Sequence, residues 1–168
     1  MAAERGPATS FMSAEGTREF VDANVLVYAY DASAGKKKVA AEALLARLWE
    51  AGSGCLSVQV LQEFFVTVTG IVAEPLSVDE AAERVLEFSA WIVFAPAAND
   101  VVRAIELQKL SKLNFWDAMI VHAAAELGSS VLWTEDLSDG QLIRGVRIRN
   151  PFARKEPPKA ERRQSKVN

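Results

Sequence analysis

Short apolar segments alternate with segments of helical spacing along most of this 168-residue chain. Apolar runs bounded by turn residues predict strands, and apolar residues three or four positions apart predict helices. The expected strands span residues 18–22, 55–58, 91–94, 131–134 and 146–148. The expected helices span residues 36–50, 59–69, 77–88, 99–110 and 114–127. Because strands separated by helices are normally parallel and joined by right-handed crossovers, the sequence predicts a three-layer α/β domain.

Length and composition favour a single soluble globular domain. Hydrophobic residues make up 50% of the chain and charged residues 24%, which is usual for such a protein. We expect the domain at residues 18–152, between a flexible extension at 1–17 and a basic, disordered tail at 153–168. The residues after Phe152 include six basic and two acidic side chains, a net charge of +4. The rest of the chain has 13 basic and 20 acidic residues, a net charge of −7. The tail is either a solvated terminus or an arm that attracts polyanions.

The sequence also favours a reducing, cytoplasmic setting. The single cysteine, Cys55, cannot form a disulfide bond within the chain. No apolar stretch approaches the roughly 18 residues of a membrane-spanning helix. Residues 1–18 lack the apolar centre of a secretory signal. We therefore expect a cytoplasmic protein with no membrane partner.

Four acidic residues stand beside apolar residues, where a charge is unfavourable unless it is compensated. They are Asp22 and Asp136, which fall at or just past the ends of the first and fourth expected strands, and Glu63 and Asp117, which lie in expected helices. A buried carboxylate needs an ion pair, hydrogen bonds or a metal ion. Carboxylate oxygens are hard ligands that suit Mg²⁺ and Mn²⁺. Ligands of α/β domains bind beyond the carboxyl ends of strands, which is where Asp22 and Asp136 fall.

Each acid also has a purely structural interpretation. Asp22 could cap the turn after its strand, with Asn24 bonding to the same loop. Glu63 could be an ordinary solvated helix residue, since both it and Asp117 border the apolar face of their helices. Asp117 lies in a first helical turn, where the helix dipole favours an acid. Asp136 begins a loop rich in turn residues. The four acids taken together, in this order, favour a metal-dependent nuclease.

Other reactive side chains are poorer candidates. His122 is the only histidine, and histidine-based ribonuclease chemistry usually needs two such groups. Cys55 lies in an expected strand and is assigned to the core. Ser57 has no neighbouring histidine to activate it. Trp116 could stack on a base, although packing in the core is its expected role.

Five short motifs occur in the order found in one nuclease family. They are Val21-Asp22-Ala23-Asn24, Gln62-Glu63-Phe64, Trp116-Asp117-Ala118, Thr134-Glu135-Asp136-Leu137 and Asn150-Pro151-Phe152. Between about Glu19 and Phe152, the chain resembles the PIN-domain nucleases, most closely the VapC-type toxins of bacterial and archaeal toxin–antitoxin pairs. Each motif is weak alone, and the ordered set is quite specific.

The resemblance implies a fold, a reaction and a set of site residues. The fold would be a parallel sheet of about five strands in the order 3-2-1-4-5, and the reaction would be RNA hydrolysis with Mg²⁺ or Mn²⁺. The acidic set would be Asp22, Glu63, Asp117 and Asp136. Metal would bind to Asp22, Asp117 and Asp136. Asn24 and Thr134 would orient the set, while Glu135 and Asp139 are alternative acids near the fourth motif.

The resemblance also implies macromolecular partners. An RNA substrate is expected, together with a cognate antitoxin that reaches a basic side chain into the acidic cleft. A homodimer is expected as well. Apolar residues of the second expected helix could contribute to its interface, although an ordinary core would use them equally: Phe64, Phe65, Val68 and Ile71.

Several other functions are alternatives to a nuclease. The chief alternative is a PIN-type module that binds RNA or protein without cutting it. A phosphate-accepting receiver domain needs paired acids after the first strand and a lysine late in the sheet. A haloacid-dehalogenase-type phosphatase needs Asp-x-Asp where this chain has Asp22-Ala23-Asn24. A dinucleotide-binding enzyme needs Gly-x-Gly-x-x-Gly after the first strand, and the sequence has none.

Overall fold

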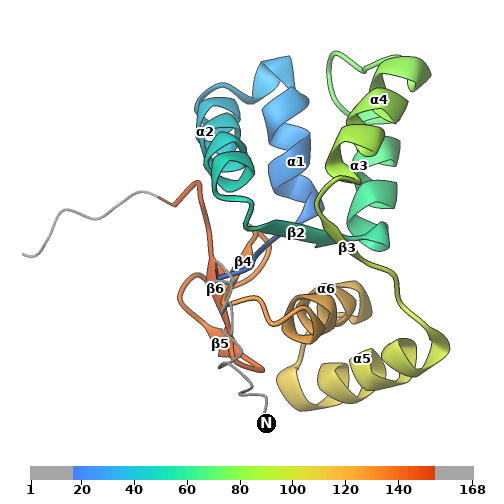
Figure 1. Cartoon of the computed structure of the whole chain (residues 1–168), viewed down its shortest axis with the longest axis vertical. Helices are drawn as coiled ribbons and strands as arrows, with labels where there is room; N and C mark the ends of the chain where they lie inside the picture. Colours follow the sequence, from blue (N-terminus) through green and yellow to red (C-terminus); the bar gives the residue numbers. More distant parts are fainter. Residues whose placement is uncertain (1–16, 154–168) are drawn as a thin grey trace, which may run out of the picture.

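A six-stranded sheet lies between two layers of helices in the computed structural model, which describes residues 17–153 (Figure 1). The strands are β1 (Glu19–Val21), β2 (Gly54–Ser57), β3 (Ile92–Phe94), β4 (Val131–Trp133), β5 (Leu142–Ile143) and β6 (Val146–Arg149). The helices are α1 (Ala23–Tyr30), the short 3-10 helix η1 (Ala32–Ala34), α2 (Lys36–Ala51), α3 (Val58–Gly70), α4 (Val78–Phe88), α5 (Ala98–Ser111) and α6 (Phe115–Glu126). Helices α1 to α4 cover one face of the sheet, and α5 and α6 cover the other (Figure 1). The predicted three-layer α/β fold is confirmed.

The strand order is β3-β2-β1-β4-β6-β5. All pairings are parallel except the one between β5 and β6. The expected order 3-2-1-4-5 is reproduced when its fifth strand is taken as β6. The expected number of about five strands is too low by one, because the two-residue strand β5 was not predicted. Strand β5 turns back onto β6 through Arg144 and Gly145, both of which have positive φ.

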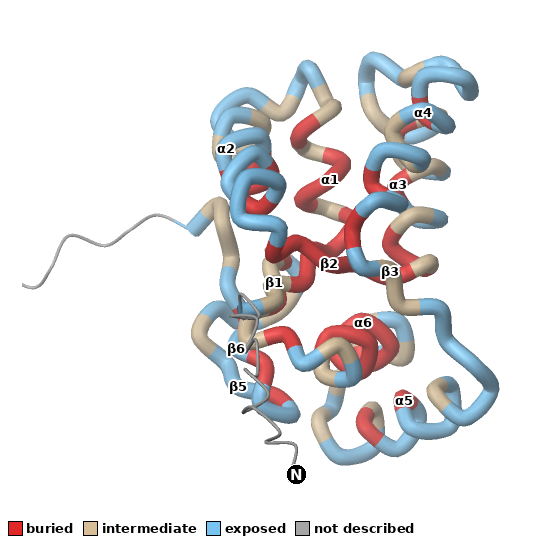
Figure 2. Tube along the Cα trace, in the orientation of Figure 1, coloured by how far each residue is buried: buried red, intermediate tan, exposed pale blue. Residues whose placement is uncertain are grey.

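The core packs against both faces of the central strands (Figure 2). Phe20, Leu56 and Leu132 are fully buried at the centres of β1, β2 and β4. A parallel sheet covered on both faces buries most of its inner strands, which explains the short apolar runs in the sequence. Helix α6 packs against β2, β4 and β6. The central strands thus form a rigid base for the residues that follow them.

Helix α1 was not predicted. Its sequence, Ala23 to Tyr30, is rich in β-branched and aromatic residues, which have low helix propensity and favour strands. The helix forms because five of its eight residues are buried, so tertiary packing outweighs local preference. Asp22 caps it by accepting a hydrogen bond from the backbone N–H of Ala23 at 2.7 Å. The helix therefore begins directly at the end of β1 and carries Asn24 in its first turn.

The other helix boundaries follow recognisable signals. Ser77 and Glu80 form the predicted capping box at the start of α4, and Asn114 caps α6 as predicted. Helix α5 was expected to open at Asn99 or Asp100, and it begins slightly earlier. Asp100 lies inside the first turn and accepts a hydrogen bond from the backbone N–H of Ala97 at 2.8 Å. Its carboxylate therefore caps the helix from within.

Two expectations concern residues that the structure does not describe. The extension at 1–17 and the basic tail at 153–168 lie outside the described residues, apart from Thr17 and Ala153. Within residues 17–153, no helix is long and apolar enough to span a membrane.

Candidate active site

The first part of the site lies at the carboxyl ends of the two central strands. Strands β1 and β4 pair in register, with Val21 opposite Trp133, so the residues that follow them, Asp22 and Thr134, are neighbours. The Thr134 hydroxyl donates to Asp22 Oδ2 at 2.8 Å. The Asn24 amide donates to Asp136 Oδ2 at 2.8 Å, to Thr134 Oγ1 at 3.0 Å and to Asp22 Oδ2 at 3.3 Å. The structure therefore brings together Asp22, Asn24, Thr134 and Asp136.

Glu63 approaches the same place from helix α3. It lines a cavity of about 440 Å³ together with Asp22, Asn24 and Asp136. The side chain of Gln59, one turn earlier on α3, donates to Glu63 Oε1 at 2.8 Å. The carboxylate of Glu63 is therefore held in a fixed position beside the Asp22 network.

Asp117 reaches the acids from the first turn of helix α6. The Asn114 side chain donates to Asp117 Oδ2 at 2.5 Å and accepts from the backbone N–H of Asp117 at 2.8 Å. Asp117 does not line the 440 Å³ cavity. It is nonetheless close enough to Asp136 and Glu63 for their charges to raise the pKa of its carboxyl group. Asp117 thus lies at the edge of the cluster, outside the cavity that the other three acids line.

The pKa values of Asp22 and Asp117 are both raised, mainly by burial and in part by the charges of Glu63 and Asp136. The pKa of Asp22 is raised from its ordinary value of 3.8 to about 7, mainly by burial and to a smaller extent by the charges of Glu63 and Asp136. Hydrogen bonds from Thr134 and from the Ala23 N–H oppose this rise. Burial is also the main cause that raises the pKa of Asp117, followed by the charge of Asp136. A positive charge placed among these acids would be strongly stabilised.

None of the four acids forms an ion pair with a basic side chain of the described residues. The ion pairs among residues 17–153 involve other acids. Glu135 is bound to Lys37 at 2.6 Å and also accepts from the Tyr28 hydroxyl. Asp139 accepts a hydrogen bond from the backbone N–H of Asn150 at 2.9 Å. The two alternative acids near the fourth motif are therefore engaged elsewhere.

The donor chemistry of the cluster fits a divalent cation. Its oxygens come from carboxylates, a hydroxyl and an amide, which are hard ligands. Asn24 Oδ1 is buried and has no hydrogen-bond partner among the described residues, so it is an available acceptor. Within residues 17–153, however, no three His, Cys, Asp or Glu side chains are already gathered as a ligand group. Like charges repel, so drawing these carboxylates closer together requires a compensating positive charge.

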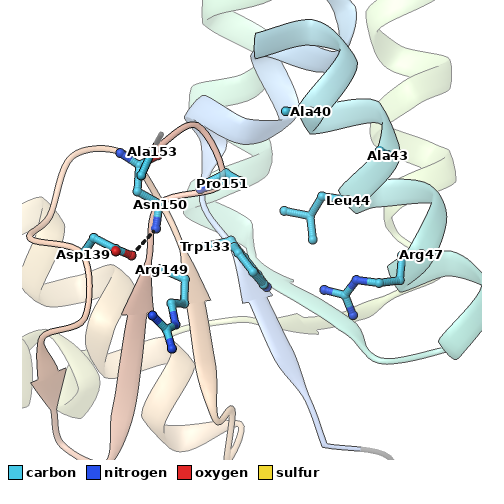
Figure 3. A pocket seen from close by; sticks show the side chains of 10 residues that line it. All are labelled: Ala40, Ala43, Leu44, Arg47, Trp133, Asp139, Arg149, Asn150, Pro151 and Ala153. Carbon is cyan, nitrogen blue, oxygen red and sulfur yellow. Dashed lines mark hydrogen bonds between the residues drawn. The ribbon is translucent and has the colours of Figure 1, made fainter. Parts of the chain in front are cut away.

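A larger cavity has none of these four acids in its lining (Figure 3). It has a volume of about 770 Å³ and lies between helix α2 and the ends of β4 and β6. Trp133 forms part of its wall, next to the guanidinium groups of Arg47 and Arg149 (Figure 3). Arg47 is paired with Glu19 through two contacts of 2.8 Å. Because none of the four acids lines this cavity, the smaller cavity is the candidate active site despite its size.

The remaining reactive side chains have structural roles, with one exception. His122 is buried and fixed between Arg144 and Asp100, at 2.7 Å and 2.8 Å. Since a guanidinium only donates, Nδ1 of His122 accepts and Nε2 donates to Asp100. Cys55 is buried in the core as expected, and Ser57 caps α3 by accepting from the Val60 N–H.

The exception is Trp116, for which the expected core position is wrong. Its side chain is 63% exposed at the start of α6. The possible dimer residues on and just after α3 differ from one another in exposure. Phe64 and Val68 are buried and belong to the core, whereas Ile71 is exposed. Phe64 and Val68 therefore cannot contribute to a dimer interface.

Sequence reasoning missed one residue that positions the acids. Gln59 is only 8% exposed, and its amide also donates to the Trp116 carbonyl at 3.4 Å, in addition to its bond with Glu63. It therefore connects α3 with the start of α6. Its position four residues before Glu63 is a recognisable signal, because side chains at that spacing share a helix face.

Comparison with known proteins agrees with this architecture. Residues 20–138 match the family model described as the PIN domain, a range that contains all four acids. Sequence comparison with curated proteins gives no match.

The similar solved structures share the fold at low sequence identity. One is a toxin–antitoxin complex from Klebsiella pneumoniae, with a TM-score of 0.58 and 18% identity over 80% of this chain and 98% of that one. A second is DNA-bound VapBC from Salmonella typhimurium, with a TM-score of 0.57, 18% identity and the same two coverages, 80% and 98%. A third is VapC20 from Mycobacterium tuberculosis, a toxin that cleaves the sarcin–ricin loop. Its TM-score is 0.52, with 17% identity over 67% of this chain and 85% of that one. With the family model matched over most of its length, the chain belongs to the PIN-domain family.

Proposed function

We propose that this protein is a metal-dependent endoribonuclease and the toxin of a toxin–antitoxin pair. The observation that carries the proposal is that Asp22, Glu63 and Asp136 line one cavity with Asp117 at its edge, and that none of the four has a basic ion-pair partner among the described residues. Membership of the PIN-domain family supports a nuclease. The fold similarity to a toxin that cleaves the sarcin–ricin loop supports RNA as the substrate.

The proposed chemistry assigns a role to each polar residue of the site. Asp22, Asp117 and Asp136 would hold Mg²⁺ or Mn²⁺, which neutralises the phosphate and lowers the pKa of a bound water. Thr134 and the Ala23 N–H fix the two oxygens of Asp22 by hydrogen bonds of 2.8 and 2.7 Å. Asn24 joins Asp22 to Asp136 and so sets their spacing. Glu63, held by Gln59, orients the attacking water and accepts its proton.

The partner proteins follow from the same proposal. An antitoxin would neutralise the acidic site by placing a lysine or arginine where the metal and the phosphate would bind. Support comes from the toxin–antitoxin complexes of similar fold, at 17–18% identity. We also propose that the protein is cytoplasmic and forms a homodimer.

The test is hydrolysis of a labelled RNA pool by the purified protein in Mn²⁺, with a chelator as the first control. We expect cleavage in Mn²⁺, none in chelator, and a loss of at least about 100-fold in Asp117→Asn. Asp139→Asn is the matched control, because Asp139 lies in the loop after Asp136 and bonds to Asn150 instead of to the acids. Cleavage that survives Asp117→Asn would refute the proposal. RNA binding without cleavage by the wild-type protein would favour the non-cleaving PIN-type module.

A further inference from the structure

The exposed indole of Trp116 stands directly beside the proposed catalytic acids. It precedes Asp117 in the first turn of α6 and is 63% exposed. The ring of Phe115 contacts it edge-on at a centroid distance of 5.2 Å, which supports the indole from one side. A single exposed aromatic residue does not by itself indicate a binding site, so the surroundings of Trp116 decide whether it has a role.

Trp116 forms one wall of a second cavity, of about 450 Å³. The cavity is lined by Gln59, Gln62, Glu63, Val66, Thr67 and Trp116. Glu63 and Thr67 also line the cavity that contains Asp22 and Asp136. The two cavities therefore adjoin along α3, and a chain crossing the acids passes next to Trp116.

Gln59 fixes the geometry of this second cavity. The buried amide donates to Glu63 Oε1 at 2.8 Å and to the Trp116 carbonyl at 3.4 Å. One side chain thus bonds both to the Glu63 carboxylate, which lines the cavity of Asp22 and Asp136, and to the helix turn that carries the indole. The position of the indole relative to the acids is set by the fold.

We propose that this second cavity binds an unpaired nucleobase of the RNA, next to the phosphate that is cut, by stacking it on Trp116. The proposal rests on the proposed nuclease function. Neither lysine nor arginine lines the cavity, so it is unsuited to a phosphate group. A flat indole with apolar Val66 and the amide of Gln62 instead matches the face and the polar edge of a base. A base can reach this position only when it is not paired, so the cavity selects single-stranded RNA.

The test measures binding of a short, fluorescein-labelled single-stranded RNA of random sequence by fluorescence anisotropy, in Ca²⁺ so that cleavage does not interfere. We expect Trp116→Ala to weaken binding by about tenfold or more, and Trp116→Phe to retain most of the affinity, because an aromatic face remains. Trp49→Ala is the matched control: Trp49 is also exposed, at 44%, but lies on α2. The same RNA annealed to its complement should bind more weakly to the wild type and be insensitive to Trp116→Ala.

The outcomes separate this inference from the proposed function. Unchanged binding by Trp116→Ala overturns the inference, and so does equal weakening by Trp116→Phe and Trp116→Ala. If cleavage of RNA does not depend on Trp116, the nuclease proposal is kept and the base site is not. If the protein binds RNA through Trp116 but cannot cleave it, the base site is supported and the nuclease proposal is refuted. If Trp116→Ala instead changes the oligomeric state in size-exclusion chromatography, the indole is a protein contact and the inference falls.

Discussion

Replacement of Asp22 by asparagine should stabilise the metal-free protein at alkaline pH. Burial raises the pKa of Asp22 from 3.8 to about 7, so the folded state binds a proton more tightly than the unfolded state does. For a group of this kind, stability is lost as the pH rises from the unfolded pKa through the folded one. The difference of about 3 pKa units corresponds to about 4 kcal/mol lost at pH 8. About 2.5 kcal/mol of that loss falls between pH 5 and pH 8.

Asparagine removes the charge but disturbs the hydrogen bonds. Its oxygen can still accept from the Ala23 N–H, whereas its amide nitrogen faces the donors of Thr134 and Asn24. This mismatch costs about 1–2 kcal/mol and does not depend on pH. The expected gain is therefore about 2–3 kcal/mol at pH 8 and near zero at pH 5.

The assay is urea unfolding of wild type and Asp22→Asn in chelator, at both pH values. The quantity to compare is the difference in unfolding free energy between the two proteins, which cancels the titration of all other groups. Asp139→Asn serves as the control, since that residue lies outside the acid cluster. A difference that stays the same from pH 5 to pH 8 would show that Asp22 is not held in a charge-disfavouring site.

Three further substitutions test the packing of the sheet and the positioning of the acids. A Cβ on Gly54 would lie 2.7 Å from the ring of Trp91, so Gly54→Ala should lower the free energy of unfolding by about 1–3 kcal/mol. Gly70→Ala, where a Cβ meets nothing within 4 Å, should be neutral or slightly stabilising in the same urea measurement. Gln59→Met keeps the volume but releases Glu63, and should lower kcat for RNA hydrolysis by about tenfold or more with a smaller change in KM. An unchanged kcat in a folded Gln59→Met protein would contradict the positioning role.

The layers of the fold were predictable because each signal for them is local. Buried strands such as β2 read as short apolar runs, and Ser77 and Asn114 mark helix starts through hydrogen bonds within one turn. Helix α1 was missed because its β-branched and aromatic residues favour a strand, and only burial by neighbouring helices makes it helical. Strand β5 has only two residues and depends on its pairing with β6.

The sequence says more about which residues are candidates for the site than about how they are arranged in space. The motif order selected the candidate acids, but the distances between side chains that lie 19 to 114 positions apart along the chain require the folded structure. Neighbouring Glu135 and Asp136 could not be separated by sequence, because what distinguishes them is the ion pair of Glu135 with Lys37. The exposure of Trp116 was likewise hidden, since an apolar residue in a helix can face either the core or the solvent.

The most direct test of the account is a crystal structure of the protein grown with Mn²⁺, using anomalous scattering to locate the metal. The account predicts an anomalous peak between the carboxylates of Asp22, Asp117 and Asp136, with oxygen ligands at about 2.1–2.3 Å. A fully occupied peak bound elsewhere, with these three carboxylates left without metal in saturating Mn²⁺, would contradict it.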